Sequence, residues 1–367
     1  MENHIEYAPL HDRKVLVSKK MTIIHTGVVY SPTIKNPYTE EYVYNFNHAP
    51  NLVNINDGNY LAAWFSGPWE IHPYQRILTS RFDGVNWTEP EIIQNTMGVS
   101  DFDPAFILSG NKIYLFYSNA RKFTPRLHGE KKGFLGTYYR YSSDFGQSWS
   151  KPFLLSTDYA CKSNGLCLKN GHLLLPVYNT AANQLGVFKS IDDGNTWELY
   201  ASDPIAIPIA EPSIIEFTEG NIVMIARTKT GTLWISELMN NGESLRMPLP
   251  SSIESYNTPA SLLMDNDSLL VCYNLGRKRN KLCISSTESL SFQWDSIIVV
   301  DQIKDNINPE SNAIHPSGSD FAVTYPSMIN YGKNKVMVAW SKYEINESEH
   351  KGEICYCIVK IEADSFE

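Results

Sequence analysis

The sequence predicts an all-β fold, a six-bladed β-propeller, because one two-strand unit recurs six times and a characteristic tight turn follows at least two of its copies. Each unit has a residue or two, usually proline, then a short apolar strand, a turn of Asp, Asn or Gly type, and a second apolar strand. The six copies are APNLVNINDGNYLAAWF, DPAFILSGNKIYLFY, NGLCLKNGHLLLPVY, EPSIIEFTEGNIVMIAR, TPASLLMDNDSLLVCY and YPSMINYGKNKVMVAW, which start at positions 49, 103, 164, 211, 258 and 325.

The turns within these units have hairpin chemistry. Pairs such as Asp57-Gly58 and Asn170-Gly171 lie between two β-rich runs, where the backbone needs a positive φ. The distance from one unit to the next exceeds what two strands require and leaves room for a four-stranded blade. No long amphipathic helical pattern occurs, so we expect every blade to be built from strands.

A second signature follows the hairpins. Residues 142–149 and 190–197 both read S-x-D-x-G-x-[ST]-W, the pattern of an aspartate box. In such a turn the Asp accepts backbone N–H groups, the Gly permits a positive φ and the Trp packs back between strands. We expect these turns to be scaffold on the outer part of the blades.

One strand-like segment, residues 21–31, precedes the first unit. We expect it to pair with the last blade, which ends in residues 354–361, since this pairing removes the free edge of an open ring. The predicted organisation is a single propeller domain over residues 21–362, with an N-terminal extension, 1–20, and a short tail, 363–367.

The composition narrows the class of partner. A net charge of −9 argues against a nucleic-acid-binding protein, and no apolar stretch is long enough to span a bilayer. The polar start of the chain predicts a cytoplasmic location by default, or secretion if a leader has been removed. The six cysteines lack a CxxC pair and are expected to be free thiols; no metal-ligand spacing is present, and no cofactor is expected.

The repeat also predicts where a site lies. If the first strand of each unit lines a central channel, its opening residues all face one end of that channel, near the exits of the second strands. The polar or charged candidates at these positions are His48, Asp103, Asn164, Glu211, Asn257 and Tyr325 at the openings and Arg121, Arg227, Arg277 and Arg279 at the exits. A carboxylate, a guanidinium and a phenol that converge on a channel are hard to explain as packing alone.

Residues 46–359 resemble the sialidase superfamily, and within it the sialidase-like proteins with BNR repeats. Glu211 and Arg227 are spaced like the glutamate and second arginine of that family, and Thr324-Tyr325-Pro326-Ser327 is similar to its nucleophile motif. The resemblance implies that Tyr325 attacks the anomeric carbon, that Glu211 takes its proton, and that Arg227 with Arg277 (or Arg279) holds a sugar carboxylate.

Two departures from the family pattern matter. His48-Ala49-Pro50 stands where the family opens its first blade with Arg-Ile-Pro, and the loop expected to carry the acid offers Glu70. The resemblance therefore implies Glu70, or less readily Asp103, as the proton donor. Trp64, six residues before Glu70, is a candidate sugar-stacking residue.

Three functions remain open on this evidence. The first is an exo-glycosidase that removes a terminal sialic or other nonulosonic acid from a glycan. The second is a polysaccharide lyase or uronate-linked glycosidase that uses His48 as its acid or base. The third is a propeller that binds carbohydrate without catalysis. The expected partner is an acidic glycan or sialoside substrate, and the sequence does not indicate the oligomeric state.

Overall fold

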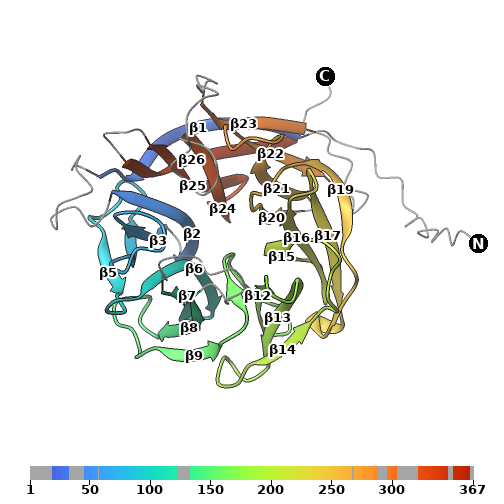
Figure 1. Cartoon of the computed structure of the whole chain (residues 1–367). Coiled ribbons are helices and arrows are strands. Elements are labelled where there is room, and N and C mark those ends of the chain that lie inside the picture. The colour runs from blue at the N-terminus through green and yellow to red at the C-terminus, as the bar shows by residue number, and fades with distance from the viewer. Residues whose placement is uncertain are drawn as a thin grey trace, which may run out of the picture.

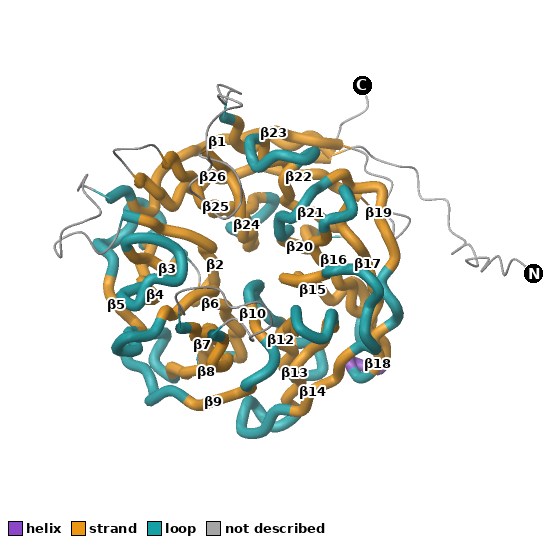
Figure 2. The backbone as a smooth tube through the Cα atoms, in the orientation of Figure 1, coloured by secondary structure: helices purple, strands orange, loops and turns teal. Residues whose placement is uncertain are grey.

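The computed structural model describes residues 19–32, 45–56, 58–121, 133–266, 268–287, 296–303, 321–345 and 350–363. Within these ranges the strands form six antiparallel sheets that surround a common axis, as Figures 1 and 2 show. The predicted all-β six-bladed propeller is therefore confirmed. The described residues hold a single helical segment, the 3-10 turn η1 (Asn240–Gly242), and no helix among them is long and apolar enough to cross a membrane.

The first three blades follow one another along the chain. Blade 1 contains β2 (Phe46–Asn56), β3 (Asn59–Gly67), β4 (Arg76–Phe82) and β5 (Glu91–Gln94). Blade 2 contains β6 (Ser100–Ser109), β7 (Lys112–Ala120), β8 (Phe134–Ser142) and β9 (Phe153–Ser156). Blade 3 contains β10 (Ala160–Cys161), β11 (Leu166–Cys167), β12 (Leu173–Asn179), β13 (Gln184–Ser190) and β14 (Glu198–Ala201). Its inner strand is thus split into two short pieces, β10 and β11, which both pair with β12.

The last three blades repeat the arrangement. Blade 4 contains β15 (Ile209–Thr218), β16 (Asn221–Thr228), β17 (Thr232–Met239), β18 (Ser244–Leu245) and β19 (Leu249–Glu254). Blade 5 contains β20 (Ser261–Asp265), β21 (Ser268–Asn274), β22 (Lys281–Thr287) and β23 (Ser296–Gln302). Blade 6 contains β24 (Phe321–Asn330), β25 (Lys335–Ile345) and β26 (His350–Ala363). The expected positive φ is present at the hairpin glycines, for example 85° at Gly58 and 84° at Gly171.

The N-terminal strand closes the ring. Strand β1 (Lys19–Tyr30) pairs antiparallel with β26, from Lys19 opposite Ala363 to Tyr30 opposite Ile354. The predicted pairing of residues 21–31 with the end of blade 6 is confirmed. Residues 1–18 and 364–367, which make up most of the predicted extension and tail, lie outside the described residues.

Buried apolar side chains lie between the blades. Each of six buried clusters joins one pair of neighbouring blades: blades 1 and 2, 2 and 3, 3 and 4, 4 and 5, 5 and 6, and 6 and 1. Trp149 and Trp197, the last residues of the two turn motifs, pack against the clusters on either side of blade 2. Burial of this apolar surface between sheets is the main force that holds the ring together. All six cysteines are free thiols, and five of them are buried.

Both turn motifs have the hydrogen bonds expected from their sequence. Asp144 Oδ1 accepts the backbone N–H groups of Gln147 and Ser148, and its Oδ2 accepts the Ser148 hydroxyl. Asp192 binds Thr196 in the same way, through both the backbone N–H and the hydroxyl. These hydrogen bonds lower the pKa of both carboxyl groups, so the turns keep their ionised Asp over the whole physiological pH range.

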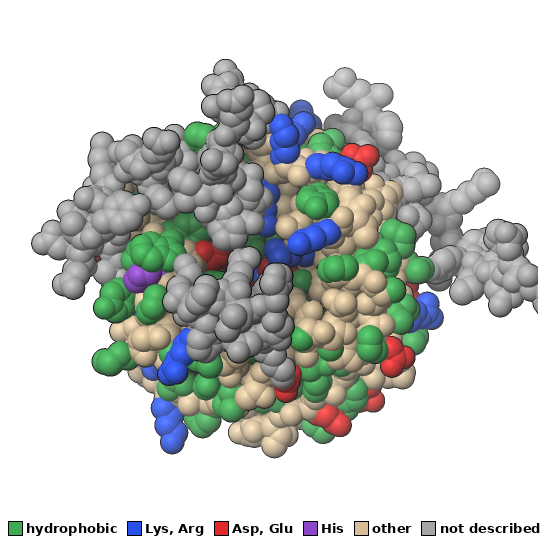
Figure 3. Space-filling model, viewed as in Figure 1, with side chains coloured by type: hydrophobic (Ala, Val, Ile, Leu, Met, Phe, Trp, Pro, Cys, Tyr) green, Lys and Arg blue, Asp and Glu red, His purple; other side chains and the backbone are tan. Residues whose placement is uncertain are grey.

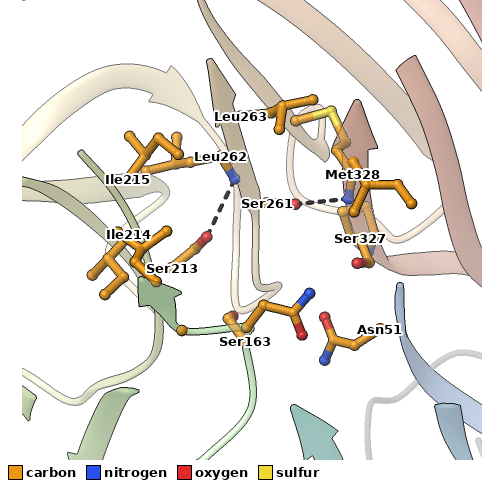
Figure 4. Close-up of a pocket in the computed structure, with 15 residues that line it drawn as sticks. Asn51, Ser163, Ser213, Ile214, Ile215, Ser261, Leu262, Leu263, Ser327 and Met328 are labelled. Atoms are coloured by element: carbon orange, nitrogen blue, oxygen red, sulfur yellow. Dashed lines mark hydrogen bonds between the residues drawn. The ribbon is translucent and has the colours of Figure 1, made fainter. Parts of the chain in front are cut away.

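Side chains near the axis connect neighbouring inner strands. The backbone N–H of Leu52 donates to Ser327 Oγ (3.1 Å). In the same way the Leu262 N–H donates to Ser213 Oγ (3.2 Å) and the Met328 N–H to Ser261 Oγ (3.0 Å). The three serines, Leu262 and Met328 line a cavity of about 160 Å³ in the central channel, and Figure 4 shows two of the bonds. Inner strands have no partner on the channel side, so each serine satisfies a donor that is otherwise buried and unpaired.

Replacing Ser327 by Ala should therefore lower the free energy of unfolding by about 1–3 kcal/mol, because the Leu52 N–H group would lose its acceptor. Ser327 is only 2% exposed. Guanidinium unfolding measures the effect. The control is Ser143→Ala in an exposed turn, where a change within about 0.5 kcal/mol is expected. Equal effects of the two substitutions would contradict this account of the inner strands.

Candidate active site

Four of the six inner strands carry the same β-bulge, and in each the first bulged residue precedes a proline. The ladder shifts register at these points in β2, β6, β15 and β24. The residues are Ala49, Asp103, Glu211 and Tyr325, with φ values of 53°, 51°, 51° and 58°. A residue before proline normally has an extended backbone, so a positive φ here is strained. A β-bulge redirects the side chain that it carries, and here it does so in four blades at the same level of the ring.

Tyr325, Glu211 and Arg227 meet at this level. The Tyr325 hydroxyl donates to Glu211 Oε1 (3.0 Å) and accepts a hydrogen bond from Arg227 Nη1 (3.0 Å). The same Arg227 Nη1 lies 2.7 Å from Glu211 Oε2. Tyr325 belongs to blade 6 and the other two to blade 4, which are not neighbours in the ring (Figure 1). The three side chains therefore reach one another across the channel.

The surroundings determine the protonation of this group. Tyr325 is 7% exposed and Glu211 5%. Burial, followed by the Glu211 carboxylate, raises the pKa of Tyr325 well above its usual range, although Arg227 lowers it. Burial lowers the pKa of Arg227, but Glu211, Tyr325 and Tyr178 together outweigh this effect and the pKa is raised overall. The site thus holds a neutral phenol between a guanidinium cation and the carboxylate that pairs with it.

Lys162 is a residue of the site that the sequence did not reveal. In blade 3 the last pair of residues in the ladder before the bulge is Cys161 and Val177. The equivalent pair in blade 4 is Ala210 and Arg227. Lys162 is thus the structural counterpart of Glu211. It is 1% exposed, and its Nζ lies 5.3 Å from the centroid of the Tyr325 ring. The sequence repeat aligns Asn164 with this position instead.

Arg279 is the second arginine at the site. Its Cζ lies 5.5 Å from the centroid of the Tyr325 ring, and its Nη2 donates to the backbone carbonyl of Asn257 (2.8 Å). Arg277, which the sequence favoured over Arg279 for this role, is exposed with its guanidinium group beside Gly231. Asn257 itself has a positive φ of 54° and binds Arg279 through its backbone.

Two further carboxyl groups lie near Glu211. Burial raises the pKa of Glu70, with a further increase from Glu211 and a decrease from Arg279. Burial also raises the pKa of Asp103 well above its usual range; Glu211 adds to this and Lys162 opposes it. Both groups therefore hold a proton to a higher pH than an ordinary carboxyl group does. Figure 3 shows acidic and basic side chains gathered around the hollow at the centre of the face seen in Figure 1.

His48 packs against the same tyrosine. Its ring centroid lies 4.2 Å from that of Tyr325, and the rings of Phe46, Phe65 and Tyr343 surround it. It is only 2% exposed. Its position is thus that of a support behind the phenol.

Three other candidates from the sequence have different positions. Asn164 joins inner strands, because its Oδ1 accepts the Phe106 N–H (2.8 Å) and its Nδ2 donates to the Leu52 carbonyl (2.6 Å). Arg121 is exposed at the end of β7. Trp64 is fully buried in the cluster between blades 1 and 6, where its Nε1 donates to Asn47 Oδ1 (2.8 Å). The prediction of Trp64 as a sugar-stacking residue is wrong for this reason.

The turn that carries Glu70 is fixed to blade 2. Glu70 is followed by Ile71, which has a strained φ of 61°, and the Ile71 N–H donates to Gln75 Oε1 (2.8 Å). The Asp101 N–H in β6 donates to the Gln75 backbone carbonyl (3.1 Å), and Gln75 Nε2 donates to the Asp101 carbonyl (2.9 Å). The Asp101 carboxyl in turn accepts the Thr96 N–H (2.7 Å) and hydroxyl (2.8 Å). Burial nevertheless raises the pKa of Asp101 to about 7.

This raised pKa predicts how stability depends on pH. Asp101 has a folded-state pKa of about 7 against an ordinary value of 3.8, so the folded protein binds a proton more tightly than the unfolded chain. The contribution of protonated Asp101 to the free energy of unfolding is complete below pH 3.8. It is lost as the pH rises to about 7, with a slope of up to about 1.4 kcal/mol per pH unit. Unfolding of wild type and Asp101→Asn between pH 4 and 8 measures it. The variant should have a shallower slope, and an unchanged slope would contradict the assignment.

Within the described residues, no group of three or more His, Cys, Asp or Glu side chains is arranged to hold a metal ion.

The protein is thus a six-bladed propeller with a buried Tyr–Glu–Arg group in its channel. The model of the BNR repeat-like domain family matches residues 58–338, more than half of the chain, and the chain belongs to that family. The superfamily resemblance in the sequence is thereby confirmed.

Among curated proteins, the anhydrosialidase of Macrobdella decora is 25% identical over 245 residues, which cover 57% of this chain and 32% of that protein. The chain thus spans about a third of the length of this relative.

Solved structures share the fold at low identity. A protein of unknown function from Dyadobacter fermentans superposes with a TM-score of 0.72 at 17% identity, over 93% of this chain and 99% of that one. The K499G mutant of NanB sialidase from Streptococcus pneumoniae has a TM-score of 0.69 at 15% identity, over 90% of this chain and 70% of that one. Trypanosoma rangeli sialidase in complex with sialic acid has a TM-score of 0.64 at 16% identity, over 93% and 58%.

Proposed function

We propose that this protein is a glycoside hydrolase that removes a terminal acidic sugar, a sialic or other nonulosonic acid, from a glycan. The observation that carries the proposal is the Tyr325 hydroxyl, which binds Glu211 and Arg227 at once in a buried site. A phenol that shares its proton with a carboxylate is an activated nucleophile. A neutral nucleophile also avoids repulsion from the carboxylate of an acidic sugar. The sialidases and anhydrosialidase among the similar proteins support this choice of substrate.

The proposed reaction has two steps. In the first, Tyr325 Oη attacks the anomeric carbon while Glu211 takes the phenolic proton, and Glu70 protonates the oxygen of the leaving group as its bond to the sugar breaks. In the second, a water molecule attacks the same carbon and releases Tyr325, to which Glu211 returns the proton; the ionised Glu70 takes a proton from the water. Asp103 is the alternative donor in the first step, since its pKa is also raised.

Arginine side chains supply the binding of the sugar carboxylate. Arg227 is 21% exposed at its side chain, so it reaches the channel while it contacts Glu211. Arg279 lies over the ring of the proposed nucleophile, Tyr325. Guanidinium groups bind carboxylates with paired, charge-assisted hydrogen bonds, which fits an anionic substrate.

A fluorogenic sialoside tests the proposal directly. Release of the fluorophore by the folded protein between pH 4 and 8 is the expected result. Absence of turnover over that range would contradict it. Unsaturated-uronate absorbance during digestion of an acidic polysaccharide would instead favour the lyase, and glycan binding that survives both Tyr325→Phe and His48→Ala without any activity would favour a binding propeller.

A further inference from the structure

Lys162 has no part in the reaction proposed above, yet it is held in place more firmly than a surface lysine. Its backbone carbonyl accepts a hydrogen bond from Asn51 Nδ2 (2.7 Å), and the same Nδ2 donates to the Pro104 carbonyl (2.6 Å). Its side chain belongs to blade 3 and lies over the ring of Tyr325, which belongs to the opposite blade. The ammonium group therefore reaches the axis of the propeller from a fixed backbone.

The charged neighbours of Lys162 explain why a cation is present there. Burial lowers its pKa, and the two groups that raise it most are Glu211 and Asp103, one in each of the adjacent blades 4 and 2. Arg227 and Cys272 also face it. An ammonium group that is 1% exposed is costly unless opposite charges are close.

The other two cations of the site already have partners. Arg227 pairs with Glu211 at 2.7 Å, and Arg279 donates to the Asn257 carbonyl and acts on Glu70. Among the cations that act on Asp103, Lys162 has the larger effect and Arg227 the smaller. Cys161, next to Lys162, also faces this carboxyl and donates to the Asp103 carbonyl. Three carboxyl groups and three cations thus lie around the channel.

We propose that Lys162 is a positioning residue that bridges the carboxyl groups of Asp103 and Glu211 electrostatically and so determines how protons are distributed beneath Tyr325. Its consequence for catalysis rests on the proposed function; the electrostatic bridge does not. Burial raises the proton affinity of the Asp103 carboxyl group, and Lys162 lowers it. Without Lys162, Asp103 holds the proton over a wider pH range, and Arg227 remains as the cation paired with Glu211.

Titration of the Asp103 carboxyl tests this bridge in the full chain without any substrate. Carboxyl ¹³C NMR of protein labelled at Asp follows the titration, and Asp103→Asn identifies the resonance. Replacing Lys162 by Met, which has similar length and no charge, should raise the midpoint by about one to two pH units, a 10- to 100-fold increase in proton affinity. A midpoint that stays within about 0.3 units in the folded variant would overturn the proposal.

A double substitution covers the case in which Lys162→Met does not fold. Lys162→Met/Asp103→Asn removes the ammonium group together with a carboxyl group that it acts on, so this variant should fold and be more stable than Lys162→Met alone. Failure of both variants to fold would mean that Lys162 acts through packing, which would overturn the proposal.

The activity assay separates this inference from the proposed function. If the protein hydrolyses the fluorogenic sialoside, Lys162→Met should shift the pH profile of kcat/KM, a change that a purely structural role does not produce. If there is no hydrolysis but the Asp103 midpoint still moves, the proposed function fails and the bridge stands. If hydrolysis occurs and neither the profile nor the midpoint moves, the bridge fails alone.

Discussion

Replacing Tyr325 by Phe is expected to lower kcat/KM for a sialoside by at least about 10³-fold, because it removes the attacking oxygen and leaves only the binding contribution of the site. The ring remains, so its contacts with His48, Lys162 and Arg279 persist. The variant should therefore fold and still bind sialic acid. Steady-state kinetics and calorimetric binding measure the two effects separately.

Tyr273→Phe is the matched control for this experiment. Tyr273 is also buried, at 5% exposure, and its hydroxyl contacts Ser285 Oγ (3.2 Å) in blade 5. The same atom is lost there, and kcat/KM should stay within about twofold because a hydroxyl far from the reacting atoms has no part in the transition state. A small loss in Tyr325→Phe, similar to that in the control, would contradict the role of Tyr325 as nucleophile.

Replacing Arg227 by Met is expected to reduce the free energy of unfolding by about 3–5 kcal/mol, because it leaves the buried Glu211 carboxylate without the cation that lies 2.7 Å away. Turnover should fall as well, since the Tyr325 hydroxyl loses its second hydrogen-bond partner. Adding Glu211→Gln to this variant should recover part of the stability, because the unpaired charge is gone. Guanidinium unfolding of the two single variants and the double variant measures the coupling.

An exposed ion pair provides the comparison. Arg246 lies 2.9 Å from Glu237, with side-chain exposures of 53% and 39%. Arg246→Met should cost only about 0–1 kcal/mol, since water screens such a pair. If Arg227→Met were as mild as Arg246→Met, or if its effect and that of Glu211→Gln were simply additive, the pair would not be the electrostatic centre of the site.

The fold follows from the sequence because each blade repeats the same local signals. Apolar alternation, hairpin glycines and the closing strand all specify contacts that are local or repeated, and the structure has them. The position of Tyr325 and Glu211 also follows from the repeat, since both precede a proline that marks the bulge.

Blade 3 shows why the rest of the site was harder to predict. There the bulge has no proline, and four residues stand opposite two, whereas in the other bulges two stand opposite one. The two extra residues shift the alignment of the third sequence unit with the other five. The repeat therefore aligns Asn164 with the position that Lys162 holds. The signal that remained in the sequence was a lysine, Lys162, two positions before Asn164.

Side-chain direction accounts for the other differences. Trp64 lies in a strand whose two faces both pack on neighbouring blades, so its burial depends on blade 6 and not on local pattern. Arg277 and Arg279 lie in the same loop, and only the path of that loop directs Arg279 toward Tyr325. Contacts between blades distant in sequence decide both cases.

Trapping of the covalent intermediate tests the central claim most directly. A sialosyl fluoride with a second fluorine at C3 should react once and accumulate on the protein, because the added fluorine destabilises the positively charged transition states while fluoride remains a good leaving group. Mass spectrometry of the digested protein should then locate the added sugar on Tyr325. A sugar attached to Glu211, Glu70 or any other residue, or turnover of sialosides with no label on Tyr325, would contradict the account.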